Sequence, residues 1–180
     1  MAESDHQIPA VSTALLAAPL QWFWAAHERH RQMCRLLDDL AEADEVWPEA
    51  TALLLAYIET EIPDHIRDEE DALFPLLRRR CPPQDNIAAV LASLAADHRA
   101  DIDLAAGVAA VLRDCLESSV PPCRDETHRA RLHAFASHER HHLALENAVV
   151  LPIAKHRLSE ADLSSISRRL LGRHEVNKNR

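Results

Sequence analysis

The sequence predicts an all-α protein, an up-down-up-down four-helix bundle followed by a short fifth helix. Its 180 residues include only two glycines, which leaves little material for hairpins or phosphate-binding loops. Long runs are rich in Ala, Leu, Arg and Glu, which are strong helix formers. Apolar residues recur at intervals of three and four along four long segments, as expected for helices that each bury one face in a core.

The first helix is expected at residues 12–43, with an interruption near Pro19. Pro48 suits the first turn of a second helix, 48–80, because a backbone N–H has no partner at that position. Pro63 lies inside this second helix. It removes one backbone hydrogen bond, so a kink is expected there.

A third helix is expected at residues 85–117 and a fourth at 124–155, each after a connection that contains proline. A fifth helix is expected at 159–173, packed outside the bundle and away from the functional site. Ser159 would cap this helix, with Asp162 three residues further on in a loose capping box.

The chain length predicts one domain with a substantial core. We expect residues 1–12 to be a flexible N-terminus, residues 13–155 to be the four-helix bundle, and residues 156–180 to be the C-terminal helix and tail. These boundaries follow the apolar pattern, which is strong in the middle range and weak at both ends.

The formal net charge of -9 argues against nucleic acid as a partner, because phosphate binding needs clustered Lys and Arg. The N-terminal residues do not have the pattern of a signal peptide, and no apolar run is long enough for a membrane span. The four cysteines form no C-x-x-C pair and are expected to be reduced. We therefore expect a cytoplasmic protein that acts away from membranes.

Two polar pairs interrupt the apolar faces of the second and fourth helices. His65 and Glu69 stack one turn apart on the second helix. Burying them would cost several kcal/mol unless something pairs with them, and a metal ion is one such partner. His142 and Glu146 repeat the spacing on the fourth helix, and a proline follows each glutamate by six residues. One pair could be a local ion pair within a core, but two equivalent pairs favour a shared metal site.

Single histidines complete this pattern on the other two helices, His27 on the first and His98 on the third. Counting residues from each turn, at about 1.5 Å per residue, places four histidines in one layer of the bundle. His138 lies one turn before His142 and is either a fifth nitrogen ligand or a packed histidine beside the site. The predicted metal ligands are His27, His65, Glu69, His98, His138, His142 and Glu146.

Two carboxylates with at least four imidazoles suit two metal ions, each carboxylate bridging both. This donor mixture favours iron over calcium or magnesium, which prefer oxygen ligands, and over structural zinc, which usually has thiolate ligands. Two non-heme, carboxylate-bridged iron ions are thus the expected cofactor. Zinc or manganese could substitute for them.

Four segments, AAHERHRQMCRLLDDL, DHIRDEEDALFPLLRRR, ADHRADIDLA and HERHHLALENAVVLP, carry a resemblance to a known family. Over residues 15–155 the chain resembles the hemerythrin-like, or HHE cation-binding, domain family, especially its single-domain bacterial members. The resemblance implies a four-helix bundle with a non-heme di-iron centre that binds dioxygen or nitric oxide.

The resemblance also implies roles for individual residues. His27 and His98 match the single histidines of the first and third helices of such domains, and the two His-x-x-x-Glu pairs match those of the second and fourth helices. Oxygen-carrying hemerythrins have His-x-x-x-His on the third helix and an aspartate on the fourth. This chain has one histidine and a glutamate there, so simple reversible oxygen carriage is not implied.

The sequence therefore predicts a non-heme di-iron protein that binds O2, NO or peroxide, for sensing, storage or scavenging. Two alternatives stay open. One is a di-iron peroxidase or oxidase; ferritin-like sites of that kind need Glu-x-x-His on two helices, and only Glu139-x-x-His142 fits. The other is an iron-responsive regulator that acts through a protein partner, whose identity the sequence does not give.

Overall fold

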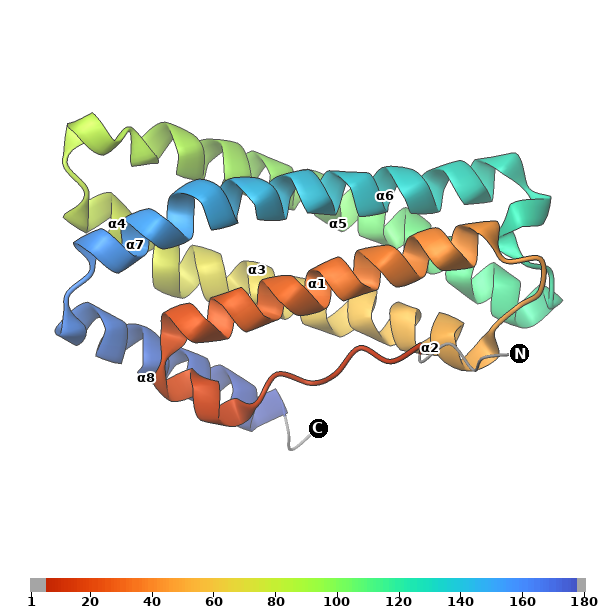
Figure 1. Cartoon of the computed structure of the whole chain (residues 1–180), viewed down its shortest axis with the longest axis horizontal. Coiled ribbons are helices and arrows are strands. Elements are labelled where there is room, and N and C mark those ends of the chain that lie inside the picture. Colours follow the sequence, from red (N-terminus) through yellow and green to blue (C-terminus); the bar gives the residue numbers. More distant parts are fainter. Residues whose placement is uncertain (1–5, 178–180) are drawn as a thin grey trace. The chain divides into compact units, whose positions relative to one another are not determined.

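The structure is a computed structural model that describes residues 6–177 (Figure 1). All elements assigned within this range are helical, which confirms the predicted all-α class with four long helical stretches and a fifth helix. In chain order they are η1 (Thr13–Ala17), α1 (Pro19–Glu42), α2 (Pro48–Ala56), η2 (Tyr57–Glu61), α3 (Ile62–Asp68), η3 (Glu69–Leu73), α4 (Phe74–Arg80), η4 (Pro83–Asp85), α5 (Ile87–Ser118), η5 (Pro122–Arg124), α6 (Glu126–Leu145), η6 (Glu146–Val150), α7 (Leu151–Arg157) and α8 (Glu160–Asn177).

Two compact units make up the chain, and each takes part of every long helical stretch. The first unit comprises Met1–Ala10, Glu28–Pro63 and Arg99–His141. The second comprises Val11–His27, Asp64–His98 and His142–Arg180. The predicted division into residues 1–12, 13–155 and 156–180 stays a prediction, and residues 1–5 and 178–180 lie outside the described part of the chain.

The first unit contains the connections from α1 to α2 and from α5 to α6. Side chains of α1 and α6 are linked by His133, whose Nδ1 lies 2.7 Å from Asp38 Oδ1 and whose Nε2 lies 2.7 Å from Glu42 Oε1. Aliphatic and aromatic side chains from all four stretches fill the core of this unit. Its largest buried members include Met33, Leu37, Leu40, Leu54, Leu112, Leu132 and Phe135.

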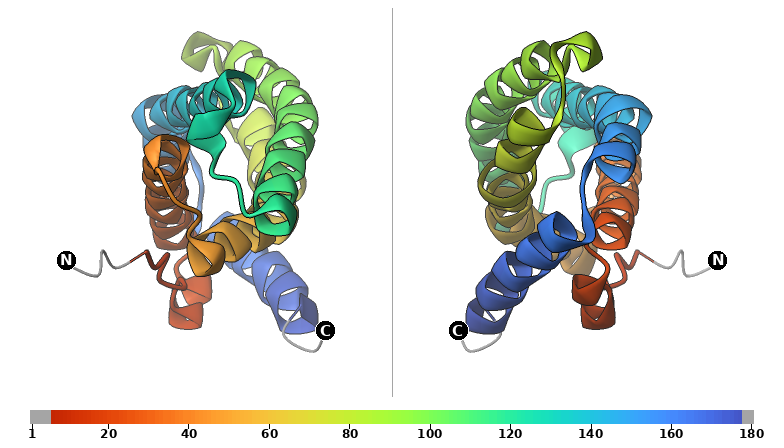
Figure 2. Two further views of the ribbon diagram at one scale, coloured as in Figure 1. Left: turned by 90° about the vertical axis from the view of Figure 1, so that its right-hand side faces the viewer. Right: turned by 90° about the vertical axis from the view of Figure 1, so that its left-hand side faces the viewer.

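The second unit contains the connection from α4 to α5 and the fifth helix. Parts of the four long stretches surround a common centre, and α8 lies outside them, packed against η1 and η3 (Figure 2). Its core combines side chains from α1, η3, α4, α5, α7 and α8. Among the buried members are Trp22, Phe23, Leu73, Phe74, Leu77, Leu91, Leu94, Leu151, Ile166 and Leu170.

The predicted capping box is present at the start of α8. The Ser159 N–H donates to Asp162 Oδ2 at 3.1 Å, and the Asp162 N–H donates to Ser159 Oγ at 3.3 Å. The same carboxylate accepts two hydrogen bonds from Arg80, at 2.8 and 2.9 Å. Arg173 and His174, near the other end of α8, bind the buried carboxylate of Asp68. Helix α8 continues to Asn177, past the predicted end at residue 173, and it contacts the residue directly before Glu69.

Three five-residue π-helical segments occur among the described residues, and each ends two residues before a proline. These segments are η2 before Pro63, η3 before Pro75 and η6 before Pro152. Proline has no N–H, and its ring clashes with the carbonyl four residues earlier, so a wider turn relieves the clash. At Pro63, where the sequence predicts a kink, the helix has a π segment directly upstream. Glu69 and Glu146 are the first residues of η3 and η6.

No helix in residues 6–177 combines the length and the apolar character that crossing a membrane would require.

Candidate metal centre

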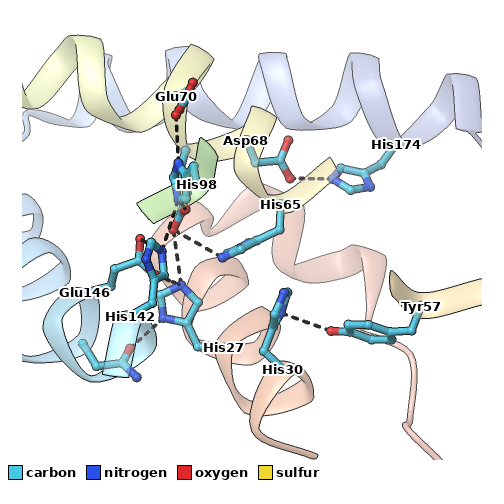
Figure 3. A network of polar contacts seen from close by, with 12 residues as sticks. His27, His30, Tyr57, His65, Asp68, Glu70, His98, His142, Glu146 and His174 are labelled. Atoms are coloured by element: carbon cyan, nitrogen blue, oxygen red, sulfur yellow. Dashed lines mark hydrogen bonds and ion pairs between the residues drawn. The ribbon is translucent and has the colours of Figure 1, made fainter. Parts of the chain in front are cut away.

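Six polar side chains of the second unit lie close together in the interior, and Figure 3 shows the four histidines among them with Glu146. They come from the parts of four long helical stretches that belong to this unit, and all are buried. Two of them are the first residues of π segments, which are frequent at functional sites. The six are His27 on α1, His65 on α3, Glu69 on η3, His98 on α5, His142 on α6 and Glu146 on η6.

The first group of possible metal ligands is formed by His27, His65, Glu69 and Glu146, whose ligand atoms all lie within 4.8 Å of one another. The Nε2 atom of His27 lies 3.4 Å from Glu69 Oε1 and 3.4 Å from Glu146 Oε2. The Nε2 atom of His65 lies 3.3 Å from the same Glu69 oxygen. Both imidazoles therefore direct the same kind of nitrogen toward the two carboxylates.

The second group is formed by Glu69, His98, His142 and Glu146. The Nε2 atom of His98 lies 3.3 Å from Glu69 Oε2, and that of His142 lies 3.2 Å from Glu146 Oε1. The two Nε2 atoms are 3.1 Å apart. Glu69 and Glu146 belong to both groups, so the two groups share both carboxylates.

These spacings fit coordination better than hydrogen bonding. Two donors bound to one ion at about 2.1 Å, with an angle between 90° and 109°, lie about 3.0–3.4 Å apart. The observed distances between nitrogen and oxygen donors, 3.2–3.4 Å, fall in this range. Within the described residues, Glu69 Oε2 and both oxygens of Glu146 are buried and receive no hydrogen bond of normal geometry. Buried acceptors of this kind are costly unless a cation binds them.

Burial and the neighbouring groups shift the pKa values of the two carboxyl groups in opposite directions. Burial and the neighbouring charge of Glu69 raise the pKa of Glu146, although His142 and His27 oppose this shift. Burial also acts to raise the pKa of Glu69, but His65, His27 and His98 outweigh it and hold that pKa well below its usual value. Two ionised carboxylates in one dry volume repel each other, and a divalent cation between them removes that repulsion.

A comparison with protein families identifies the domain. A family model described as the hemerythrin HHE cation-binding domain matches residues 18–154, most of the chain. The chain belongs to this family. No curated protein and no solved structure matches the chain significantly. Family membership and the two buried His/Glu groups together indicate a protein that binds cations.

Apolar side chains enclose the imidazoles of this hemerythrin-family site. Phe74 stacks on His98, with ring centroids 5.8 Å apart and an angle of 7° between the ring planes. The ring of Phe23 meets His65 edge-on, with centroids 6.2 Å apart. Phe23 and Phe74 are fully buried, as is Leu94 of α5. This surrounding keeps water away from the donor atoms, which strengthens their interaction with a cation.

Six of the seven predicted ligands are thus brought together, and the seventh has a different partner. His138 lies in the first unit, where its Nε2 is 2.7 Å from Asp101 Oδ1 and its side chain is 31 % exposed. Neither ligand group found among the described residues includes it. A role for His138 as a fifth nitrogen ligand stays a prediction. Glu61, four residues before His65, accepts a hydrogen bond from Arg29 Nη1 at 2.8 Å.

Two residues beside the site were not predicted. The Nδ1–H of His98 donates to Glu70 Oε1 at 2.8 Å, and the Nδ1–H of His27 donates to Asn147 Oδ1 at 2.7 Å. Each partner is the residue directly after one of the shared glutamates. With Nδ1 as the donor, the Nε2 lone pair of each ring is directed at the carboxylates, as metal binding requires. In the sequence, the only sign of these two acceptors is that each directly follows a glutamate of a His-x-x-x-Glu pair.

Proposed function

We propose that this hemerythrin-family protein holds two non-heme iron ions and binds O2, NO or peroxide at them. The observation that carries the proposal is the convergence of four Nε2 atoms and two shared carboxylates in one buried volume. Each group would supply two imidazoles and share both carboxylates. Two histidines with carboxylate oxygen, and coordination positions left open, are typical of non-heme ferrous sites that react with oxygen.

The chain's own residues have three tasks in this proposal. Glu69 and Glu146 would hold the two cations, because each has one oxygen near each imidazole pair. His27 and His98 keep Nε2 free for coordination because their Nδ1–H groups are already used. Phe23 and Phe74 enclose the rings, admit a small apolar molecule and limit water. When bound, two ferrous ions supply up to two electrons and an open position for a small ligand.

Iron is the preferred metal because the donor set combines imidazole with carboxylate and contains no thiolate. Zinc or manganese fit the same donors and are expected to bind in place of iron. From the sequence pattern alone, we also propose a cytoplasmic location.

The test is anaerobic loading with Fe(II), followed by separate exposure to NO, O2 and hydrogen peroxide. Two iron ions per chain and a change in the visible spectrum with one of these ligands are the expected results. His142→Ala should lose iron, whereas His141→Ala, a change at an exposed neighbour that binds the Ser137 carbonyl, should retain it. A protein that holds two iron ions but gives no spectral change with any of the three ligands would refute the ligand-binding part of the proposal.

The same preparation separates binding from catalysis. Steady consumption of peroxide in the presence of an electron donor would identify a peroxidase. NO or O2 binding without such turnover would identify a sensor, store or scavenger.

A further inference from the structure

The two cation positions share both carboxylates, so differences between them come from the imidazoles. His27 and His65 face one position, and His98 and His142 face the other. Neither His27 nor His98 belongs to a His-x-x-x-Glu pair. The orientation of these two rings therefore depends on contacts outside the two His-x-x-x-Glu pairs.

The residue that follows each shared glutamate contacts one of these two rings. Glu70 follows Glu69 and accepts from His98 Nδ1 at 2.8 Å. Asn147 follows Glu146 and accepts from His27 Nδ1 at 2.7 Å. The repeated motif is thus one residue longer than its ligands, His-x-x-x-Glu-Glu in one copy and His-x-x-x-Glu-Asn in the other. Each copy supplies a bridging carboxylate and also the acceptor that orients a histidine from another helix.

The two acceptors differ in charge. Glu70 carries a carboxylate, and its side chain is 42 % exposed. Asn147 carries a neutral amide. A carboxylate behind an imidazole increases the electron density that the other ring nitrogen offers to a metal, and a neutral amide does so less. The contacts have nearly equal lengths, so the charge is the main difference between them.

We propose that Glu70 and Asn147 are positioning residues for His98 and His27, and that the charge of Glu70 makes His98 the stronger metal donor of the two. The predicted effect on metal affinity rests on the proposed two-metal function. The orientation of the two rings, however, is a property of the metal-free chain and can be measured separately.

The first measurement is the tautomer of each ring in metal-free protein, read from long-range ¹H–¹⁵N spectra. At a pH where both rings are neutral, His27 and His98 should both carry the proton on Nδ1. Glu70→Ala should shift His98 toward a mixture of tautomers and leave His27 unchanged, and Asn147→Ala should do the reverse. Unchanged tautomers of both rings in both variants would overturn the proposal.

The second measurement is Zn²⁺ affinity, determined by competition with a chromophoric chelator. Glu70→Gln keeps an acceptor oxygen but removes the charge, and it should weaken one binding step about tenfold. Asn147→Asp adds a charge behind His27 and should strengthen the other step by a similar factor. Zn²⁺-induced shifts of the assigned histidine signals show which position each step fills. The control is Asp103→Asn, which removes one exposed charge elsewhere on α5 and should leave both steps within about twofold of wild type.

The two proposals fail in different ways. If fewer than two Zn²⁺ ions bind, the two-metal function is refuted, while the tautomer measurement still decides the orientation of the rings. If two ions bind but Glu70→Gln behaves like Asp103→Asn, the charge effect of Glu70 is refuted and the two-metal function stands.

Discussion

Replacing Glu146 by glutamine should change stability in opposite directions with and without metal. Neither oxygen of Glu146 receives a hydrogen bond of normal geometry in the described structure, and the carboxylate of Glu69 is nearby. In Glu146→Gln the side-chain amide can donate to Nε2 of His142 or His27, which lie 3.2 and 3.4 Å from the present oxygens. The charge repulsion is removed at the same time.

The cost of a buried acceptor without a partner is about 1–3 kcal/mol, so the metal-free variant should be more stable than metal-free wild type by about that amount. In a chain of this length, this corresponds to a rise in Tm of roughly 3–10 °C. With metal bound the sign reverses, because the variant loses a ligand shared by both ions and with it the stabilisation that tight binding gives the folded state.

Differential scanning calorimetry with a chelator, and again with saturating Zn²⁺, measures both effects on the same samples. Glu45→Gln is the matched control, because Glu45 is exposed in the connection between α1 and α2 and should leave Tm unchanged in both states. A Tm shift of the same sign in both states would refute the reasoning, as would an unchanged Tm in metal-free Glu146→Gln.

Three further predictions concern parts of the fold outside the ligands. Hydrogen bonds to Glu42 and Asp38 raise the pKa of His133, so its stabilising effect is complete below the ordinary value of 6.5 and is lost as the pH rises through the raised value. The stability difference between wild type and His133→Asn in urea unfolding should therefore shrink from about pH 6 to pH 9. Pro152→Ala restores a backbone N–H and should let η6 form regular α-helix, which would turn Glu146 away from the other ligands. Zn²⁺ affinity should then fall about tenfold, while Tm stays equal or rises. Arg173→Gln leaves the buried Asp68 with His174 as its remaining hydrogen-bond partner from α8, so stability should fall by about 1–3 kcal/mol, and hydrogen exchange in α8 should become faster.

The ligand cluster could be predicted because helical periodicity and residue counting both constrain it. His65 and Glu69 interrupt an apolar face, and so do His142 and Glu146, which makes each pair visible against its surroundings. Equal distances from the turns then place His27 in the same layer. Neither the periodicity argument nor the residue count depends on the detailed shape of a helical turn, so the π segments do not change their result.

The partners of the ligands could not be predicted in the same way. Glu70 and Asn147 follow their ligands inside π segments, where the angle between successive side chains departs from the α-helical value on which periodicity depends. The prolines that accompany these segments were visible, but proline in a helix also predicts a simple kink. His138 shares a face with His142, and four residues of helix separate the two by about 6 Å along the axis. In the structure, Asp101 is the partner of its imidazole.

The contact between α8 and Asp68 could not be predicted from the sequence either. Arg173 and His174 belong to a polar end of the chain without apolar periodicity, and their contact with Asp68 joins residues about one hundred positions apart. Such a contact depends on where the fifth helix packs, which local pattern does not determine.

The central claim is that two iron ions lie between these six side chains. The most direct measurement is anomalous X-ray diffraction at the iron edge from crystals of protein loaded anaerobically with Fe(II). The account predicts two anomalous peaks, one among His27, His65, Glu69 and Glu146 and the other among Glu69, His98, His142 and Glu146. A single peak, a peak elsewhere, or no peak at this cluster would contradict it.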